Sequence, residues 1–313
     1  MLLGFTVGFS WVNSMSYEHY IGVIDEKSVL AECGPMRLVI CAWKKDQPQL
    51  NMALKAAEKS FTYLQRIAKH RTLLCRPPNA VRVPPLDALA LQMVKSVRRI
   101  GDDDLTPIAA VAGTIADAVA DWLFERGMTK VVVDNGGDVS IRLTGDETAC
   151  VGIRPSVISQ YISHIVRLNA ERRAWGITTS GFGGRSLTRG IASAVTTLAE
   201  NASVADAAST AIANACFVEN ENIRQMPAEE VDPHTDLGGI PVTVRIGELS
   251  WIDLKTALDR ALYRAKELVA RGVIFGAFIC QERNFVMTSS LKAFVSRFNT
   301  RLNLLGEEPP GRS

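Results

Sequence analysis

Residues Ser203 to Asn214 are the stretch that most constrains how this chain folds. Their sequence, SVADAASTAIAN, places Asp206, Thr210 and Asn214 four residues apart, and every other side chain there is Ala, Ser, Val or Ile. On a helix these three residues share one face, so a carboxylate, a hydroxyl and an amide lie in one stripe. Such oxygen ligands suit a hard cation such as Mg²⁺, while the small side chains allow close packing.

A structural interpretation competes with the metal site. Ser203 at the N-cap and Asp206 at N3 form a capping-box pattern that needs no metal. Taken alone, the stretch favours capping. The choice depends on which other unusual elements converge on this helix.

The composition is that of an ordinary globular chain and argues against several protein classes. Of 313 residues, 47% are hydrophobic and 22% charged, and the net charge is +2. Lys and Arg are scattered and aromatic residues make up only 7%, so no nucleic-acid partner is indicated. The six cysteines show no C-x-x-C spacing, which indicates buried thiols in a reducing compartment rather than disulfides or a zinc framework.

The chain begins with an apolar run, MLLGFTVGFSWVNSM, that lacks a basic start and a small-x-small cleavage site. The run is too short to span a bilayer, so we expect no membrane partner and a cytoplasmic protein. We interpret residues 1–14 as a non-native or disordered extension, with translation starting at Met15. Residues 15–305 are expected to form one domain, followed by a disordered tail at 306–313.

Hydrophobic periodicity predicts the remaining elements. Two apolar runs between residues 20 and 43, broken at Gly34-Pro35, predict a strand pair. Helices are predicted over 49–70, 86–100, 107–126 and 254–271, a strand hairpin over 130–143, and strands at 192–199, 242–246, 273–280 and 284–288. The elements are clustered rather than arranged as a regular βαβ series, which predicts an α+β fold with mainly antiparallel sheet.

Carboxylates occur at two further places before the helix of Asp206. The run Asp102-Asp103-Asp104 could chelate a cation, but it precedes Thr106-Pro107 and is interpreted as a solvated loop leading into a helix. Within that helix, Gly113 indicates close approach of another backbone. Asp117 follows one turn later on an apolar surface and requires a partner.

Two glycine-rich segments precede the helix of Asp206. Asn135-Gly136-Gly137-Asp138 lies between strand-like runs and predicts a hairpin turn, although its backbone N–H groups could also approach a phosphate. Residues 176–190, GITTSGFGGRSLTRG, hold five glycines and five hydroxyl residues, which predicts a functional loop rather than a packed segment. Short strands connect these segments to the helix, so all three can meet.

Together these motifs resemble the ApbE family, the FAD:protein FMN transferases. Four family signatures match here: GGD at 136–138, TSG at Thr179-Ser180-Gly181, A-D-x-x-x-T at Ala205-Asp206 with Thr210, and G-x-x-x-D at Gly113 with Asp117. The chain is most similar to a bacterial and archaeal branch marked by A-A-V-A-G, E-N-G-G-D, G-H-S-x-S-x-G and A-D-A-A-x-T-A-I-A-N. Here these motifs fall at 109–113, 134–138, 184–190 and 205–214.

The resemblance implies a T-fold-related architecture, with antiparallel sheets and packed helices around a central cleft. It also implies that Asp206, Thr210 and the carbonyl of Thr178 hold Mg²⁺ against the pyrophosphate of FAD or another flavin nucleotide. The cofactor-binding residues would be Gly113, Asp117, Asn135, Gly136, Gly137, Asp138, Thr179, Ser180, Gly181 and Arg189. The family transfers FMN to a Thr or Ser hydroxyl of an acceptor protein and releases AMP.

The chain departs from the family in the second glycine-rich segment. The family's H-x-x-D-P-x-T-G segment is absent, Arg185 replaces the branch's loop histidine, and Ser193 replaces an acidic residue. The exchange removes a general base and adds a guanidinium that can clamp a phosphate. We predict Arg185 and Ser186 as the catalytic residues.

Three hypotheses stay open. The first is an Mg²⁺-dependent flavin-nucleotide transferase or hydrolase. The second is a non-catalytic flavin- or nucleotide-binding accessory protein in a redox or sulfur-assimilation pathway, and the third is a purely structural role for the glycines and the helix. A homodimer is compatible with each of them.

Overall fold

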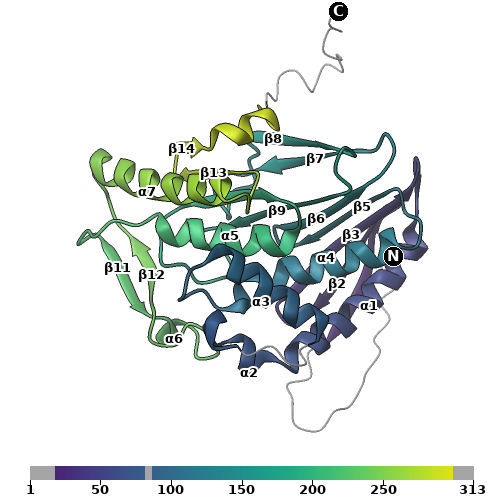
Figure 1. Ribbon diagram of the computed structural model, residues 1–313, viewed down its shortest axis with the longest axis horizontal. Coiled ribbons are helices and arrows are strands. Elements are labelled where there is room, and N and C mark those ends of the chain that lie inside the picture. The colour runs from purple at the N-terminus through teal and green to yellow at the C-terminus, as the bar shows by residue number, and fades with distance from the viewer. Residues whose placement is uncertain (1–17, 82–86, 299–313) are drawn as a thin grey trace, which may run out of the picture.

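A large antiparallel sheet forms the centre of the protein (Figure 1). The structure is a computed structural model that describes residues 18–81 and 87–298. The predictions for residues 1–14, for a start at Met15 and for a tail at 306–313 lie outside these residues.

Every strand pairing in the described residues is antiparallel, and the main sheet has ten strands in the order β1-β2-β3-β5-β6-β9-β10-β13-β14, with β4 on β3. Its strands are β1 (His19–Asp25), β2 (Ser28–Cys33), β3 (Met36–Lys44), β4 (Gln47–Pro48), β5 (Lys130–Asn135), β6 (Asp138–Leu143), β9 (Ala174–Ser180), β10 (Ala194–Ala199), β13 (Gly276–Gln281) and β14 (Asn284–Met287). A second sheet contains β7 (Thr148–Ile153), β8 (His164–Asn169) and β15 (Val295–Arg297), and a ribbon contains β11 (Ile223–Pro227) and β12 (Pro241–Ile246).

The helices gather on one face of the main sheet, as Figure 1 shows for α1, α3, α4 and α5. Their bounds are α1 (Leu50–Ala68), α2 (Arg71–Leu74), α3 (Ala88–Ile100), α4 (Val111–Phe124), α5 (Ala202–Ala215), α6 (Ala228–Val231) and α7 (Trp251–Ala270). Short 3₁₀ turns lie at Pro78–Ala80, Pro107–Ala110 and Ser289–Ala293. The larger hydrophobic core lies between this layer and the sheet.

The opposite face of the main sheet packs on the sheet of β7, β8 and β15 and forms a second core. Side chains alternate along a strand, so Val139 and Ile141 of β6 point into this core. The intervening residues Asp138, Ser140 and Arg142 therefore point toward the helices. This alternation places polar groups of β6 beneath α4 and α5.

The α+β class, the mainly antiparallel sheet and the predicted long helices are confirmed. The strand pair predicted between residues 20 and 43 is wrong in number, because Ser28–Cys33 forms a third strand between the other two. The sequence reasoning also missed β7, β8, β11 and β15. These are short strands whose partners, rather than their own periodicity, fix their conformation.

The prediction that residues 176–190 form one functional loop is wrong for the first five residues, which end strand β9. Gly176 is buried, and a Cβ there would overlap the backbone at Asn201. Its glycine therefore serves packing, because it lets the start of α5 lie directly on the sheet. Only residues 181–193 form the connection to β10.

The capping box at Ser203 is also wrong. Helix α5 begins at Ala202, and the side chain of Asn201 caps it by accepting a hydrogen bond from the N–H of Val204 at 2.9 Å. The Ser203 hydroxyl is instead buried and hydrogen-bonds Thr114 and Ser96. Asp206 thus lies beyond the first turn and has no role in capping its own helix.

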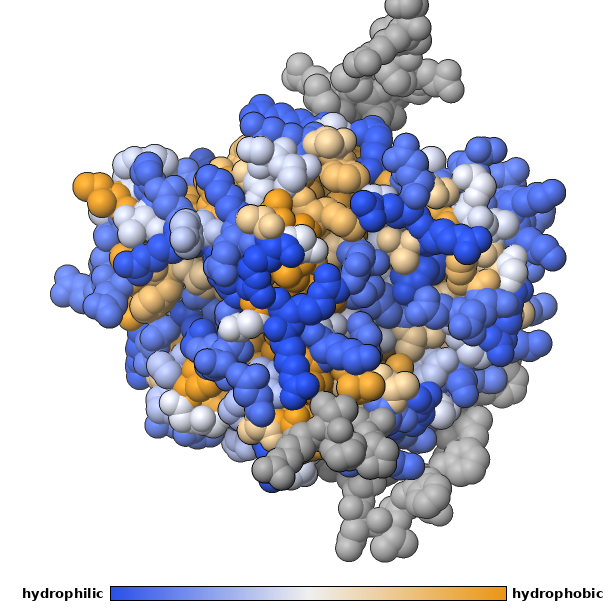
Figure 2. Space-filling view, viewed as in Figure 1, coloured by the Kyte–Doolittle hydropathy of each residue, from blue (hydrophilic) through white to orange (hydrophobic). Residues whose placement is uncertain are grey.

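One helical stretch of the described residues, Pro107–Phe124, is apolar and long enough to cross a membrane, but 56% of it is buried inside the fold. Core helices of soluble proteins pass the same test, so the stretch is only weak evidence of a membrane span. The face shown in Figure 2 is mainly hydrophilic, with hydrophobic residues in small groups between.

Candidate functional site

Helices α4 and α5 cross at Gly113, where a Cβ would overlap the carbonyl group of Ala202. The crossing helices carry matching sequences, GTIAD at 113–117 and ASVAD at 202–206. The equivalent residues Thr114 and Ser203 meet through a hydrogen bond of 2.7 Å between their hydroxyls. The two helix starts therefore form a local pseudo-twofold pair.

Each helix supplies the carboxylate that caps the other. Asp117 of α4 accepts hydrogen bonds from the N–H of Ala202 at 3.1 Å and of Ser203 at 2.9 Å. Asp206 of α5 accepts one from the N–H of Gly113 at 2.9 Å. A carboxylate at a helix N-terminus is stabilised by the unpaired N–H groups and the helix dipole.

The two carboxylates differ in how their charge is balanced. Asp117 also accepts hydrogen bonds from the Ser140 hydroxyl at 2.6 Å and from the buried guanidinium of Arg142 at 3.2 Å. Asp206 forms no ion pair with any described residue, and a second carboxylate, Asp138 of β6, lies close enough for the two charges to interact. The charge of Asp117 is balanced by Arg142, whereas no described cationic side chain forms an ion pair with Asp206.

Burial, together with neighbouring carboxylates, raises the pKa values of Asp206 and Asp138. Burial raises the pKa of Asp206 from 3.8 to about 7, although the N–H groups of Gly113 and Ala112 oppose the shift. Burial and the charges of Asp206 and Asp134 raise the pKa of Asp138 well above its usual range, against the opposing charge of Arg185. At neutral pH the pair therefore favours holding a proton, and a cation placed there would release it.

The turn between β5 and β6 borders this pair of carboxylates. Gly136 and Gly137 have φ of +70° and +112°, which favours glycine, and Asp134 accepts a hydrogen bond from the N–H of Gly137 at 2.7 Å. The Arg185 guanidinium lies directly against Gly136 and donates to the carbonyl of Pro35 at 3.2 Å. Arg185 thus covers the glycine turn within electrostatic reach of Asp138.

Strand β9 and helix α5 place the other predicted metal ligands beside Asp206. Thr178 pairs directly with Asp138 across the β6–β9 ladder, and its hydroxyl donates to Ser209 of α5 at 3.3 Å. Thr210 lies one turn beyond Asp206 on α5. The structure therefore brings Gly113, Gly136, Asp138, Thr178, Arg185, Asp206 and Thr210 into one region.

Other predicted cofactor-binding residues make contacts within the protein. The buried Asn135 side chain accepts a hydrogen bond from the N–H of Arg37 and donates one to the carbonyl of Ala112. The Thr179 hydroxyl bonds Thr196 on the sheet face opposite α5. Since Asp117 is also occupied by its caps and Arg142, cofactor contacts by these three side chains stay predictions.

Three predicted residues lie at the end of β9 or in the connection that follows it. Ser180 is half-buried at the end of β9, and a Cβ at Gly181 would come within 2.7 Å of the Ser193 carbonyl. Ser186 is exposed next to Arg185. Their roles also stay predictions.

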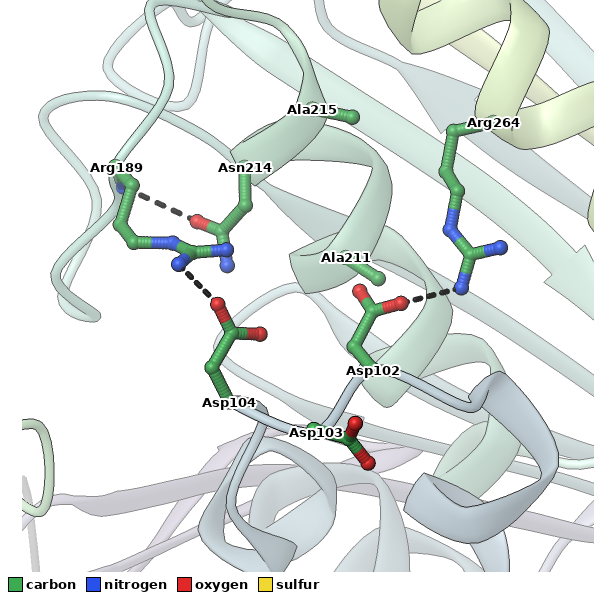
Figure 3. A pocket seen from close by; sticks show the side chains of 8 residues that line it. All are labelled: Asp102, Asp103, Asp104, Arg189, Ala211, Asn214, Ala215 and Arg264. Carbon is green, nitrogen blue, oxygen red and sulfur yellow. Dashed lines mark hydrogen bonds and ion pairs between the residues drawn. The ribbon is translucent and has the colours of Figure 1, made fainter. Parts of the chain in front are cut away.

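Arg189 lies at the other end of α5, in a pocket of about 510 Å³ (Figure 3). Its backbone N–H donates to the Asn214 side chain at 3.0 Å, and its guanidinium pairs with Asp104. Asn214 thus anchors the loop instead of extending the stripe of Asp206. In the same pocket Asp102 forms an ion pair with Arg264, and its burial raises its pKa. The prediction of a solvated loop at Asp102-Asp103-Asp104 therefore holds for Asp103 and Asp104, which are exposed, but not for Asp102.

The two pockets described for this structure do not coincide with the expected central cleft. The second, of about 750 Å³, lies beside the start of α5 and is lined by Asp117, Arg142 and Asn201 among others. Neither pocket is lined by Asp138 or Asp206. Among the described residues, no three His, Cys, Asp or Glu side chains are placed to hold a metal ion, so a metal at Asp206 would also need hydroxyl or carbonyl oxygens.

Sequence reasoning missed Arg142 and Asn201. The alternation of Asp138, Ser140 and Arg142 along one strand would have identified a polar row on one face, because side chains two residues apart share a face. The match between GTIAD and ASVAD would have revealed that Asp117 and Asp206 are equivalent. The partner required for Asp117 is confirmed and is Arg142.

Comparison with known proteins identifies the family of the chain. A family model described as "AbpE bacteria" matches residues 23–288, which include both crossing helices and both glycine segments. The chain belongs to this family. AbpE membership confirms the resemblance to the ApbE-like branch.

The AbpE chain also matches curated relatives and solved structures. It is 30% identical to a UPF0280 protein of Methanococcus maripaludis strain C7 over 48% of this chain and 62% of the relative, and 41% identical to one of Archaeoglobus fulgidus over 34% and 43%. The matches span 62%, 51% and 65% of the first three relatives. The flavin transferase ApbE of Vibrio cholerae is 13% identical, with a TM-score of 0.45 over 94% of this chain and 99% of that one.

We expect the ligand-free protein to lose stability as the pH rises through about 7. The folded state binds the Asp206 proton more tightly than the unfolded state, so its contribution is full below the unfolded pKa of 3.8 and is lost as Asp206 ionises near 7. Thermal denaturation of the wild type and of Asp206→Asn at about pH 5.5 and about pH 8 isolates the contribution of Asp206 protonation to stability. A midpoint difference between the two proteins that does not change with pH would contradict it.

Proposed function

We propose that this protein binds a flavin nucleotide with Mg²⁺ at Asp206 and cleaves the pyrophosphate of FAD, releasing AMP. The observation that carries the proposal is the pair Asp206 and Asp138, without an ion-pair partner among the described residues, beside the glycine turn and Arg185. The motif resemblance to FAD:protein FMN transferases supports the choice of flavin. The FMN would pass to a Ser or Thr hydroxyl of an acceptor protein or to water.

The chemistry of the site supports a cation at Asp206. The equivalent carboxylate, Asp117, has Arg142 as its counter-charge, and nothing corresponds to that guanidinium on the Asp206 side of the described structure. Asp206, Thr210 and the carbonyl of Thr178 would hold Mg²⁺, since all are hard oxygen donors. A bound Mg²⁺ would neutralise charge on the pyrophosphate.

The remaining residues have separate tasks in this proposal. Arg185 would bind a phosphate oxygen, because its guanidinium is exposed and donates only to the neutral carbonyl of Pro35 among described residues. The Gly136–Gly137 backbone would let the phosphate approach without a side chain in its way. Once a bound cation has displaced the proton held by the pair, the Asp138 carboxylate would accept the proton of the attacking hydroxyl, a task for which the site offers no histidine among the described residues.

Incubation with FAD tests the proposal. We expect the purified protein to release AMP from FAD only when Mg²⁺ is present, measured by chromatography, and a Ser- or Thr-containing acceptor to retain covalent FMN. Chelation of the metal should stop both. FAD that remains intact with Mg²⁺ would rule out the catalytic part.

A second candidate function is binding without cleavage. The observation that favours it is Arg185 in the position of the branch's histidine, since a guanidinium binds phosphate but cannot act as a base. In that case FAD would bind in the presence of Mg²⁺ and be recovered unchanged. The same incubation distinguishes the two functions.

We expect Arg185→Met to weaken binding of FAD by about tenfold, because one charge-assisted hydrogen bond contributes roughly 1.5 kcal/mol or more. The matched control is Arg260→Met, since Arg260 is also exposed and donates to a backbone carbonyl, that of Phe217. Titration calorimetry with FAD and Mg²⁺ measures both. Equal affinity of the two variants would remove Arg185 from the site.

A further inference from the structure

Asn135 ends strand β5, and its buried side chain joins the start of β3 to the start of α4. The side-chain oxygen accepts a hydrogen bond from the N–H of Arg37 at 3.2 Å, and the side-chain nitrogen donates to the carbonyl of Ala112 at 3.1 Å. Only the oxygen can accept and only the nitrogen can donate, so the two bonds fix the orientation of the amide. Asn135 therefore ties the first turn of α4 to the main sheet.

The carbonyl that Asn135 holds belongs to the same peptide group as an N–H that binds Asp206. This peptide joins Ala112 to Gly113, and the N–H of Gly113 donates to Asp206 Oδ2 at 2.9 Å. A peptide group is planar, so fixing its carbonyl also fixes the direction of its N–H. A hydrogen bond to the carbonyl also polarises the peptide and strengthens the N–H as a donor. Asn135 thus acts on Asp206 through one peptide group.

The two halves of the helix crossing differ in how the sheet supports their carboxylates. Asp117 accepts hydrogen bonds directly from Ser140 and Arg142 of β6, and Arg142 also balances its charge. No described side chain donates a hydrogen bond to the Asp206 carboxylate, which is held by backbone N–H groups. On this side the sheet acts through the neutral amide of Asn135, which can orient the carboxylate and leave its charge available to a cation.

We propose that Asn135 is a positioning residue of the cation site, because it fixes the Ala112–Gly113 peptide and thereby the orientation in which Asp206 binds Mg²⁺. The proposal rests on the proposed function for the identity of the cation ligand. It gives Asn135 a different task from the direct cofactor contact that the motif resemblance implies. Groups that orient a metal ligand commonly change metal affinity by about 10- to 100-fold when they are removed.

The test compares Asn135→Ala with Asn220→Ala. The control residue lies beyond the C-terminal end of α5, and its side chain also accepts from a backbone N–H, that of Asn222 at 2.8 Å, and donates, to Asp253 at 3.1 Å. The probe is Mn²⁺ without nucleotide, since Mn²⁺ takes the same oxygen ligands as Mg²⁺ and the free ion is counted by electron paramagnetic resonance. We expect Asn135→Ala to bind Mn²⁺ at least about tenfold more weakly and Asn220→Ala to bind it normally.

A second readout separates positioning from a purely structural role. Asn135→Ala should need at least about tenfold more Mg²⁺ for half-maximal AMP release from FAD, yet reach the wild-type rate and FAD affinity at saturating Mg²⁺. Circular dichroism checks that the variant is folded. If it is not, Asn135→Ser replaces it, since one short hydroxyl keeps a polar group in the buried position but cannot span both partners. The same increase in the Mg²⁺ requirement is expected.

The outcomes distinguish this proposal from the proposed function. Normal Mn²⁺ affinity of a folded Asn135 variant would overturn the positioning role and leave the proposed function intact. Weak FAD binding that excess Mg²⁺ does not restore would also overturn it, and would place Asn135 against the cofactor or behind Arg185, which the carbonyl of Pro35 holds from the β2–β3 turn. A wild type that binds no Mn²⁺ and leaves FAD intact would overturn both.

Discussion

Asp206→Asn should abolish Mg²⁺-dependent binding of FAD and reduce AMP release at least about 100-fold, because a carboxylate ligand of a charge-neutralising cation contributes several kcal/mol. Asparagine has a similar shape, and its carbonyl oxygen can still accept the hydrogen bond from Gly113. The helix crossing should therefore survive. Calorimetry with Mg²⁺ and FAD, together with chromatographic detection of AMP, measures the effect.

The control for this variant is Asp259→Asn, which removes an exposed carboxylate of α7 that pairs with Lys255. That change should leave Mg²⁺ and FAD binding unaltered. Circular dichroism of both variants should match the wild type. If Asp206→Asn binds Mg²⁺ and FAD normally, the carboxylate is only a helix cap and the proposed metal site is wrong.

Gly113→Ala should destabilise the protein by about 3 kcal/mol or more, although alanine is the better helix former by roughly 1 kcal/mol. The new methyl group would overlap the carbonyl of Ala202, which is backbone and cannot move without displacing α5. Crowding thus reverses the sign that helix propensity alone predicts. Urea denaturation followed by circular dichroism gives the free energy of unfolding.

Gly238→Ala is the matched control, because a Cβ at Gly238 would meet nothing within 4 Å and its φ is ordinary. We expect a change within about 0.5 kcal/mol for this exposed loop position. Gly113→Ala should also weaken Mg²⁺ binding, since the displaced helix carries Asp206. A Gly113→Ala protein as stable as the wild type would show that the crossing can relax.

The sequence predicts the elements that depend on local periodicity. The long amphipathic helices, the hairpin at Asn135–Asp138 and the approach at Gly113 each follow from a pattern within a few residues. The extra strand Ser28–Cys33 and the strands of the second sheet do not, because their pairing is decided by neighbours distant in sequence. Cross-strand contacts override local preference at these positions.

The candidate site divides in the same way. Residue types and spacing identify Asp206, the glycine turn and Arg185, and the structure brings them together. Residue types and spacing do not reveal that Asp104 and Asn214 hold Arg189, or that Asn201 rather than Ser203 caps α5. Both contacts depend on how the loops pack against the rest of the fold. Judged by local sequence alone, Asn201 and Ser203 are equally suitable caps. The hydrogen bond of Ser203 to Thr114 decides between them, because it takes up the Ser203 hydroxyl.

The reciprocal caps make the backbone of one helix a reporter of events at the other. The N–H groups of Gly113 and Ala112 bond the carboxylate that is proposed to bind the cation. A cation that draws electron density or an oxygen of Asp206 away would loosen these bonds without any change at Asp117. Amide chemical shifts and hydrogen exchange of these two residues would then record occupancy of the site.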